Sequence, residues 1–127
     1  FCSNKMIKML IKSGKKIIDT KILILGITFK ENCPDIRNSK VVEVYNEFKE
    51  FGLKVDVYDP EADPQKVKEE YNINLTENLT EKYDGILFAV SHKKFSIINI
   101  ESLKNDSKTV VYDLKGFLPR DQVNSRL

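Results

Sequence analysis

The sequence predicts an α/β fold in three layers, built on a doubly wound, mainly parallel sheet of about five strands. Segments with strand patterns alternate with segments with helix patterns through most of the 127 residues, the order expected when helices connect parallel strands. Two strand segments, "KILIL" from Lys21 and "GILFAV" from Gly85, are apolar almost throughout. Such continuous apolar runs are typical of strands buried on both faces of a sheet.

The composition indicates one globular domain and argues against several classes of protein. Hydrophobic residues make up 41% of the chain and charged residues 31%, which is typical of a folded soluble protein. The 21 lysines and arginines nearly balance the 19 aspartates and glutamates, so the net charge of +2 points to no nucleic-acid or membrane partner. No apolar run approaches the ~20 residues of a membrane span, and no signal-peptide pattern is present. We therefore expect a cytoplasmic protein.

The first predicted element is an amphipathic helix over residues 4–18. Asn4 suits its N-cap and Gly14 the position after its end. A basic amphipathic helix also suits a membrane surface or calmodulin, but packing against its own protein is the favoured interpretation. The start "FCSNK" lacks a methionine, so we expect a piece of a longer chain. The apolar face holds Met6, Ile7, Leu10 and Ile11.

The next elements form a strand–helix–strand unit. Residues 20–26 predict a buried strand that ends at Gly26. Residues 39–51 predict a helix, capped by Asn38 or Ser39 and ended by Gly52. Residues 53–60 alternate as a strand and stop at a turn proline. The helix should bury Val41, Val42, Tyr45 and Phe48.

The remaining elements are shorter. We predict helices over residues 63–72, 76–83 and, more weakly, 93–105; strands over residues 73–75, 84–90 and 108–114; and a turn-like tail over residues 115–127.

Basic residues follow three of the predicted strands. The loop after the first strand has about ten residues, where ~2–6 are usual, and Gly26 is its only glycine. Ligands of doubly wound sheets bind beyond the carboxyl ends of the strands, where the strand order reverses. Cations there suit a phosphate or pyrophosphate, although Lys93 and Lys94 are better explained as solvated side chains. The candidates are Lys30, Arg37, His92, Lys93, Lys94 and Lys115.

Asp59, His92 and Cys33 each have a functional and a structural interpretation. Asp59 ends a strand where dinucleotide-binding folds hold a ribose, yet its "DP" turn explains it equally well. His92 suits an acid, a base or a phosphate contact, and a positioning role is favoured because the sequence identifies no partner for it. Cys33 is better read as a free structural thiol than as a nucleophile. With Cys2 it forms no metal-binding pattern, so no metal site is expected.

The motif "LGITFKENCPDIRNSK" (25–40), followed by "VVEVYNEFKEFGLKVDVYDP", closely resembles the C-terminal domain of the nucleotide-sugar 6-dehydrogenases. This family comprises UDP-glucose, GDP-mannose and UDP-N-acetylhexosamine dehydrogenases. The wording "FKENCPDIRNSK" is most like the bacterial UDP-N-acetylglucosamine/galactosamine branch, which serves polysaccharide synthesis. "YDGILFAVSHKKF" and "VVYDLKG" continue the resemblance over nearly the whole chain.

The resemblance implies a Rossmann-like domain that grips the UDP part of a UDP-sugar. Phe29, Lys30 and, on a looser match, Lys115 would contact the substrate, and Arg37 would reach the NAD pyrophosphate. Residues 1–19 would be the end of a central interdomain helix, and residues 20–127 the substrate-binding domain. NAD would be held mainly by an N-terminal domain, which would also be this domain's partner in a homodimeric enzyme. No catalytic cysteine motif is present, so this chain by itself is expected to be inactive.

Two alternatives stay open from the sequence. Within the family, the parent enzyme could oxidise UDP-glucose or UDP-N-acetylmannosamine. Outside it, the chain could be a stand-alone nucleotide-binding module without catalysis.

Overall fold

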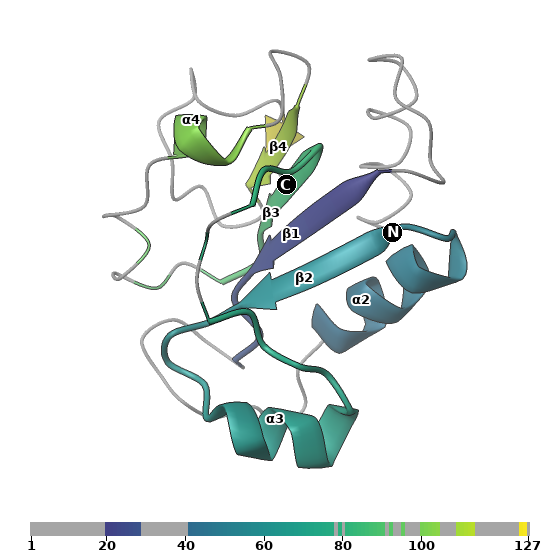
Figure 1. Ribbon diagram of the computed structural model, residues 1–127, viewed down its shortest axis with the longest axis vertical. Coiled ribbons are helices and arrows are strands. Elements are labelled where there is room, and N and C mark those ends of the chain that lie inside the picture. The colour runs from purple at the N-terminus through teal and green to yellow at the C-terminus, as the bar shows by residue number, and fades with distance from the viewer. Residues whose placement is uncertain are drawn as a thin grey trace.

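A computed structural model describes residues 20–28, 41–77, 79, 81–90, 92, 95, 100–104, 109–113 and 125–126. The elements within these ranges are shown in Figure 1. In chain order they are β1 (Lys21–Leu25), α2 (Val41–Glu50), β2 (Lys54–Tyr58), α3 (Pro64–Tyr71), β3 (Gly85–Phe88), α4 (Ile100–Leu103), β4 (Val110–Asp113) and β5 (Ser125–Arg126).

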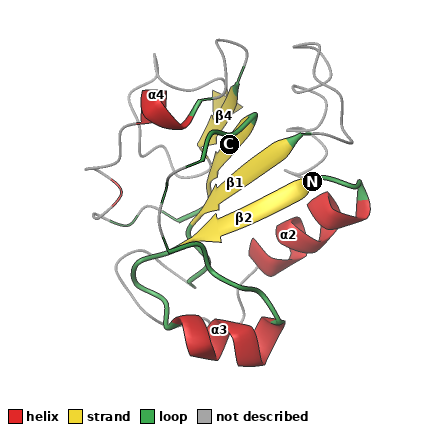
Figure 2. Cartoon of the chain, viewed as in Figure 1, coloured by secondary structure: helices red, strands yellow, loops and turns green. Residues whose placement is uncertain are grey.

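The strands form one sheet in the order β2-β1-β3-β4-β5, and every neighbouring pair is parallel. The chain first moves from β1 outward to β2 and then returns to β3 on the other side of β1. The strand order therefore reverses between β1 and β3, as in doubly wound sheets. Figure 2 shows α2 and α3 on one side of the sheet and α4 on the other. The predicted three-layer, doubly wound parallel architecture is confirmed.

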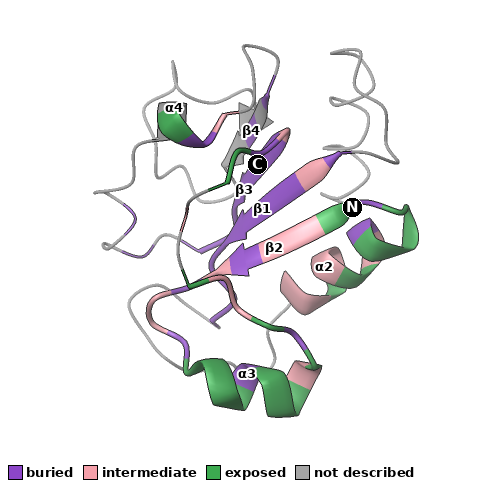
Figure 3. Cartoon of the chain, in the orientation of Figure 1, coloured by how far each residue is buried: buried purple, intermediate pink, exposed green. Residues whose placement is uncertain are grey.

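The sheet separates two apolar cores, and β1 contributes to both. Ile22 and Ile24 point to the face covered by α2 and α3, which we call the α2-side core. Leu23 and Leu25 point to the opposite face, the α4-side core. Figure 3 shows β1 and β3 buried along most of their length. The continuous apolar runs therefore have the predicted cause, because alternate residues of a strand point to opposite faces and both faces are covered.

Helix α2 lies where the 39–51 prediction placed it, and its apolar residues pack on the α2-side core as expected. The helix ends in a Schellman motif. The Gly52 N–H donates to the Lys49 carbonyl at 3.0 Å, and the Leu53 N–H donates to the Phe48 carbonyl at 3.2 Å. Gly52 has φ +87°, a left-handed conformation that glycine adopts without a Cβ clash. The predicted stop at Gly52 is confirmed.

Helix α3 confirms the prediction for residues 63–72. The Asp63 carboxylate caps its start by accepting from the Gln65 N–H at 3.0 Å, and Pro64 occupies the first turn. Asn72 ends the helix in the left-handed conformation, at φ 58°. Val67 is buried on the inner face of α3 and fixes this helix to the α2-side core.

The strand predicted at residues 73–75 and the helix predicted at 76–83 are wrong for the residues described there. The residues that the structure describes between α3 and Tyr83 (72–77, 79, 81 and 82) form no helix or strand. Ile73 packs in the α2-side core, whereas Leu79 and Tyr83 pack in the α4-side core. The connection from β1 to β2 and the connection from β2 to β3 run in opposite directions along the sheet, so right-handed connections place them on opposite faces. Because α3 packs on the same face as α2, the chain must change faces between α3 and β3. It passes beside β2, where the Thr76 N–H donates to the Val57 carbonyl at 2.7 Å.

The last part of the chain departs from prediction at the tail. Within the weak helix predicted over 93–105, the described residues Ile100–Leu103 form α4, as predicted. The tail was expected to be turn-like, but Ser125–Arg126 pairs with β4 as β5. This pairing depends on the free side of β4, which the local sequence of the tail does not reveal. The strands predicted at 84–90 and 108–114 are confirmed as β3 and β4. The helix predicted over 4–18 lies outside the described residues.

We expect Gly52→Ala to lower the free energy of unfolding by ~1–2 kcal/mol, the cost of holding an L-residue in a left-handed conformation. A Cβ at Gly52 would meet nothing within 4 Å, so backbone strain is the only cause. Gly52→Asn is the matched control, since asparagine tolerates this conformation, and it should lose clearly less. Urea unfolding of both variants measures the difference. Equal losses would contradict the backbone explanation.

Candidate functional site

The carboxyl ends of the four longer strands lie level with one another. Leu25 pairs in register with Tyr58 of β2 and with Phe88 of β3. Phe88 in turn pairs with Asp113 of β4. The chain segments that follow these strands therefore all leave the sheet at one edge, and the reversal of strand order lies in the middle of it. This is the edge where doubly wound proteins bind ligands.

The loops after β1 and β3 touch each other at this edge. The Leu25 carbonyl accepts from the Ala89 N–H at 3.0 Å and from the Val90 N–H at 3.3 Å. Gly26 follows with φ +103°, and a Cβ there would lie 2.6 Å from the Cβ of Val90 and 2.9 Å from its nitrogen. Only glycine fits this position. The single glycine of the predicted loop therefore serves close packing between two loops.

The Asp59 carboxylate, directly after β2, binds the start of the loop after β1. Its Oδ2 accepts from the Ile27 N–H at 2.7 Å and from the Thr28 N–H at 3.1 Å. Its Oδ1 accepts from the Glu61 N–H at 2.8 Å, which closes the "DP" turn on itself. One carboxylate thus fixes both its own turn and the start of the loop after β1.

His92, in the loop after β3, completes the group. Its Nε2 lies 3.0 Å from Asp59 Oδ2 and 3.0 Å from Thr28 Oγ1. The side chains of His92 and Asp59 are both 0% exposed. Because an ionised carboxylate only accepts, Nε2 carries the proton and donates it toward Asp59. The imidazole ring also meets Phe95 edge-on, at a centroid distance of 5.2 Å.

Opposing effects act on the ionisation of Asp59. Burial raises the pKa of this carboxyl group, because the charged form loses its hydration. The hydrogen bonds from His92, Ile27 and Glu61, together with the electrostatic attraction of His92, act against burial and prevail. The pKa of Asp59 is therefore lowered from its ordinary value, and the carboxylate stays ionised inside the protein.

These contacts decide between the two interpretations of Asp59. Asp59 receives four hydrogen bonds from inside the protein, three at Oδ2 and one at Oδ1, and its side chain is 0% exposed. The carboxylate therefore faces the protein and not a ligand space, which favours the turn interpretation over the ribose interpretation. His92 has the partner that the sequence did not identify. The sequence did contain a signal for this pair, because an aspartate and a histidine each follow a strand that neighbours β1.

The structure does not describe the residues predicted to bind ligands. Phe29, Lys30, Arg37 and Lys115 lie outside the described residues, as do Lys93, Lys94 and Cys33. The structure does describe residues that come shortly before them in the sequence. Thr28 precedes Phe29, His92 precedes Lys93, and Asp113 stands two positions before Lys115. All three of these preceding residues belong to the carboxyl edge.

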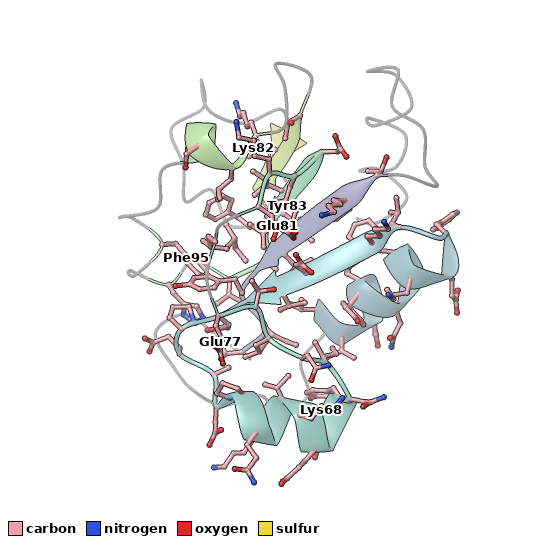
Figure 4. The ribbon with its side chains drawn as sticks, viewed as in Figure 1. Lys68, Glu77, Glu81, Lys82, Tyr83 and Phe95 are labelled. Atoms are coloured by element: carbon pink, nitrogen blue, oxygen red, sulfur yellow. The ribbon has the colours of Figure 1, made fainter. Side chains whose placement is uncertain are left out.

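Apart from the carboxyl edge, a hollow of about 240 Å³ lies on the α4 side of the sheet. Figure 4 shows two of its residues, Glu81 and Tyr83, over this face. Glu81 pairs with Lys21 at 3.2 Å, and the Tyr83 hydroxyl donates to Asp56 at 2.7 Å. Burial and the Asp56 carboxylate raise the pKa of Tyr83. With its acids occupied by neighbours, this hollow is the weaker candidate. It is lined by Lys21, Lys54, Asp56, Glu81 and Tyr83.

Two further properties concern only the described ranges. No group of three histidine, cysteine, aspartate or glutamate side chains there is arranged to hold a metal ion. None of the helices described has the length and apolar character needed to cross a membrane.

Comparison with known proteins defines the class of this domain. Residues 23–120 match the model of the UDP-glucose/GDP-mannose dehydrogenase family, UDP binding domain. The chain therefore belongs to this family, as the motif in the loop after β1 predicted.

Individual relatives agree with this assignment. The chain is 41% identical to a UDP-N-acetyl-D-glucosamine 6-dehydrogenase of Salmonella typhi, which covers 100% of this chain and 31% of the relative. It is 36% identical to a protein of the same name from Pseudomonas aeruginosa, over 98% of this chain and 30% of the relative. The chain thus spans about a third of the length of these relatives.

Solved structures share the fold. An NDP-N-acetyl-D-galactosaminuronic acid dehydrogenase from Methanosarcina mazei superimposes with a TM-score of 0.74 at 20% identity, over 94% of this chain and 26% of that one. A UDP-D-ManNAc dehydrogenase from Pyrococcus horikoshii gives 0.73 at 22% identity, over 98% of this chain and 29% of that one. These similarities support the Rossmann-like architecture.

The lowered pKa of Asp59 gives a pH-dependent stability with a defined sign. A depressed carboxyl pKa stabilises the fold above the unfolded value of about 4 and loses this contribution as the pH falls through the folded value. At neutral pH we expect Asp59→Asn to lower the free energy of unfolding by ~1.5–3 kcal/mol, since hydrogen bonds to a charged group are replaced. In acid the variant and the wild type should converge.

Urea unfolding from about pH 7 to about pH 3 measures this convergence. The matched control is Asp63→Asn, because asparagine caps a helix as well as aspartate does; it should keep the wild-type acid dependence. A constant gap between Asp59→Asn and wild type at every pH would contradict the assignment.

Proposed function

We propose that this chain is the UDP-binding C-terminal domain of an NAD-dependent UDP-sugar 6-dehydrogenase whose substrate is a UDP-N-acetylhexosamine. The observation that carries the proposal is the family match over residues 23–120, together with the names of the relatives at 41% and 36% identity. Such an enzyme oxidises the sugar C6 alcohol to a carboxylate in two steps, removing four electrons in total. The product would serve polysaccharide synthesis in the cytoplasm.

The substrate contacts we assign to this domain come from the basic loop segments at the carboxyl edge. Phe29 and Lys30 would contact the UDP part, with Lys115 adding a further contact. An ammonium group suits a diphosphate as a compact point charge. The support for this assignment is the position of Thr28, which the Asp59 carboxylate holds at the reversal of strand order.

The described residues do not form the NAD-binding arrangement of a dinucleotide-binding Rossmann fold. The position of the ribose-binding acid is filled by Asp59, whose side chain is fully buried and hydrogen-bonded inside the protein. Gly26 packs against Val90 and leaves no glycine-lined approach for a pyrophosphate. We therefore assign NAD mainly to an N-terminal domain of the parent protein, with Arg37 reaching its pyrophosphate.

The division of the chain follows from the same proposal. Residues 20–127 form the nucleotide-sugar domain, and residues 1–19 form the end of the helix that joins it to the NAD domain. The parent enzyme would be a homodimer with its active site between the two domains.

The isolated 127-residue chain should produce no NADH with any UDP-sugar, because NAD is assigned to the N-terminal domain and this chain carries no catalytic cysteine motif. It should bind UDP with a dissociation constant on the order of millimolar, about 4 kcal/mol, since half of the closed site is absent and each ordered side chain costs entropy. Calorimetry and absorbance at the NADH band test both statements. Micromolar binding of UDP would favour a stand-alone nucleotide-binding module instead.

In the full-length parent, Lys30 and Arg37 should affect different ligands. Lys30→Ala should raise the apparent constant for the UDP-sugar by about 10- to 150-fold, the value of one hydrogen bond to a charged group, and leave the NAD constant nearly unchanged. Arg37→Ala should do the reverse. Steady-state kinetics with each ligand varied, followed as NADH formation, measure both constants.

Trials with UDP-N-acetylglucosamine, UDP-N-acetylgalactosamine, UDP-N-acetylmannosamine and UDP-glucose identify the sugar in the same assay. A thermal melt serves as the control for folding. If both variants shift both constants equally and melt early, the residues only hold the shape of the loop and the division of labour is wrong.

A further inference from the structure

Three loops at the reversal of strand order converge on one buried pair, Asp59 and His92. Asp59 belongs to the turn after β2, His92 to the loop after β3, and Asp59 binds Ile27 and Thr28 in the loop after β1. Neither side chain of the pair has any exposed surface. The pair is therefore placed to hold these loops in one relative arrangement.

We propose that the Asp59–His92 pair positions the loop that starts at Phe29, and so sets the affinity of the parent enzyme for its UDP-sugar. This inference rests on the function proposed above, because it assigns Phe29 and Lys30 to that ligand. Asp59 and His92 act through the loop and do not touch the substrate themselves.

The geometry explains how a buried pair controls a loop. Two successive amides, those of Ile27 and Thr28, donate to the same oxygen, Oδ2 of Asp59. Aiming two neighbouring N–H groups at one atom restricts the backbone dihedrals between them and hence the direction in which the chain continues. The next two residues are Phe29 and Lys30. The carboxylate therefore fixes the last turn before the predicted ligand contacts.

His92 keeps the carboxylate in that role. It supplies the one side-chain donor among the four hydrogen bonds that Asp59 receives. Without this donor, a buried negative charge is left undersatisfied, and such a group gains by moving toward water. Movement of Asp59 would release the Ile27 and Thr28 amides and let the loop sample other arrangements.

Looser positioning weakens binding in a calculable way. The apparent dissociation constant rises by the inverse of the fraction of molecules in the binding-competent arrangement. If the loop spends about a tenth of its time in that arrangement, affinity falls tenfold. Binding of NAD should respond less, because Arg37 stands nine residues beyond Thr28 in the sequence and only four before α2.

The test uses the full-length parent enzyme and three variants. His92→Phe keeps a ring against Phe95 but removes the donor. His92→Gln restores an N–H near the position of Nε2. Leu103→Ala removes buried apolar contact from the α4-side core and is the control for simple loss of stability. Leu103 lies beside Tyr83, whose N–H donates to its carbonyl at 2.7 Å before the start of β3, at the opposite end of the strands from the carboxyl edge. Apparent constants for the UDP-sugar and for NAD, the kcat and the melting temperature are measured for each.

We expect His92→Phe to raise the constant for the UDP-sugar about tenfold or more with a much smaller change for NAD, and His92→Gln to restore most of the affinity. Leu103→Ala should melt earlier with both constants unchanged. If His92→Phe does not fold, Asp59→Asn replaces it with the same expectation.

Two results would overturn the inference, and they are distinguishable. His92→Phe behaving like Leu103→Ala, in an active parent, would show that the pair only stabilises the fold, and would leave the proposed function intact. A wild-type parent that neither oxidises nor binds a UDP-sugar would remove the proposed function and the inference together.

Discussion

The arrangement of the carboxyl edge depends on one buried carboxylate. Asp59 gathers hydrogen bonds from the loop after β1, from its own turn and from His92 beyond β3. A buried charge is tolerated only when its acceptor positions are filled, so the loops that supply the donors are held where they are. The close packing of Gly26 on Val90 is part of the same arrangement. Together these contacts bring the segments after three strands to one place.

This internal use of Asp59 distinguishes the domain from a dinucleotide-binding one with a similar sheet. Both have an acid after the second strand and a loop at the reversal of strand order. In a dinucleotide fold the acid faces a ribose and a glycine-rich turn faces a pyrophosphate. Here the acid faces the protein, and the long loop carries cations instead of glycines. The sheet architecture therefore does not by itself determine what the acid after the second strand binds.

The sequence was sufficient for the elements whose pattern is local. β1 and β3 were predictable because their apolar runs need no other information, and the end of α2 was predictable from Gly52. The 73–83 segment was predicted wrongly because its path depends on which face the chain must reach, and β5 because it depends on the free side of β4. Asp59 and His92 are 33 residues apart, and only the strand order brings them together. The motif of the basic loop identified the family without revealing what supports the loop.

The hydrogen bond from Thr76 to Val57 also has a consequence for how the molecule meets its neighbours. β2 is the outermost strand on its side of the sheet, and an outermost strand with bare amides and carbonyls invites another chain to add to it. The connection from α3 to β3 runs along this side and uses the outward carbonyl of Val57. The segment between α3 and β3, which changes faces to reach β3, thus also occupies an outward carbonyl of β2 that another strand could otherwise bind. Substitutions that break this contact would uncover the Val57 carbonyl and favour self-association through β2.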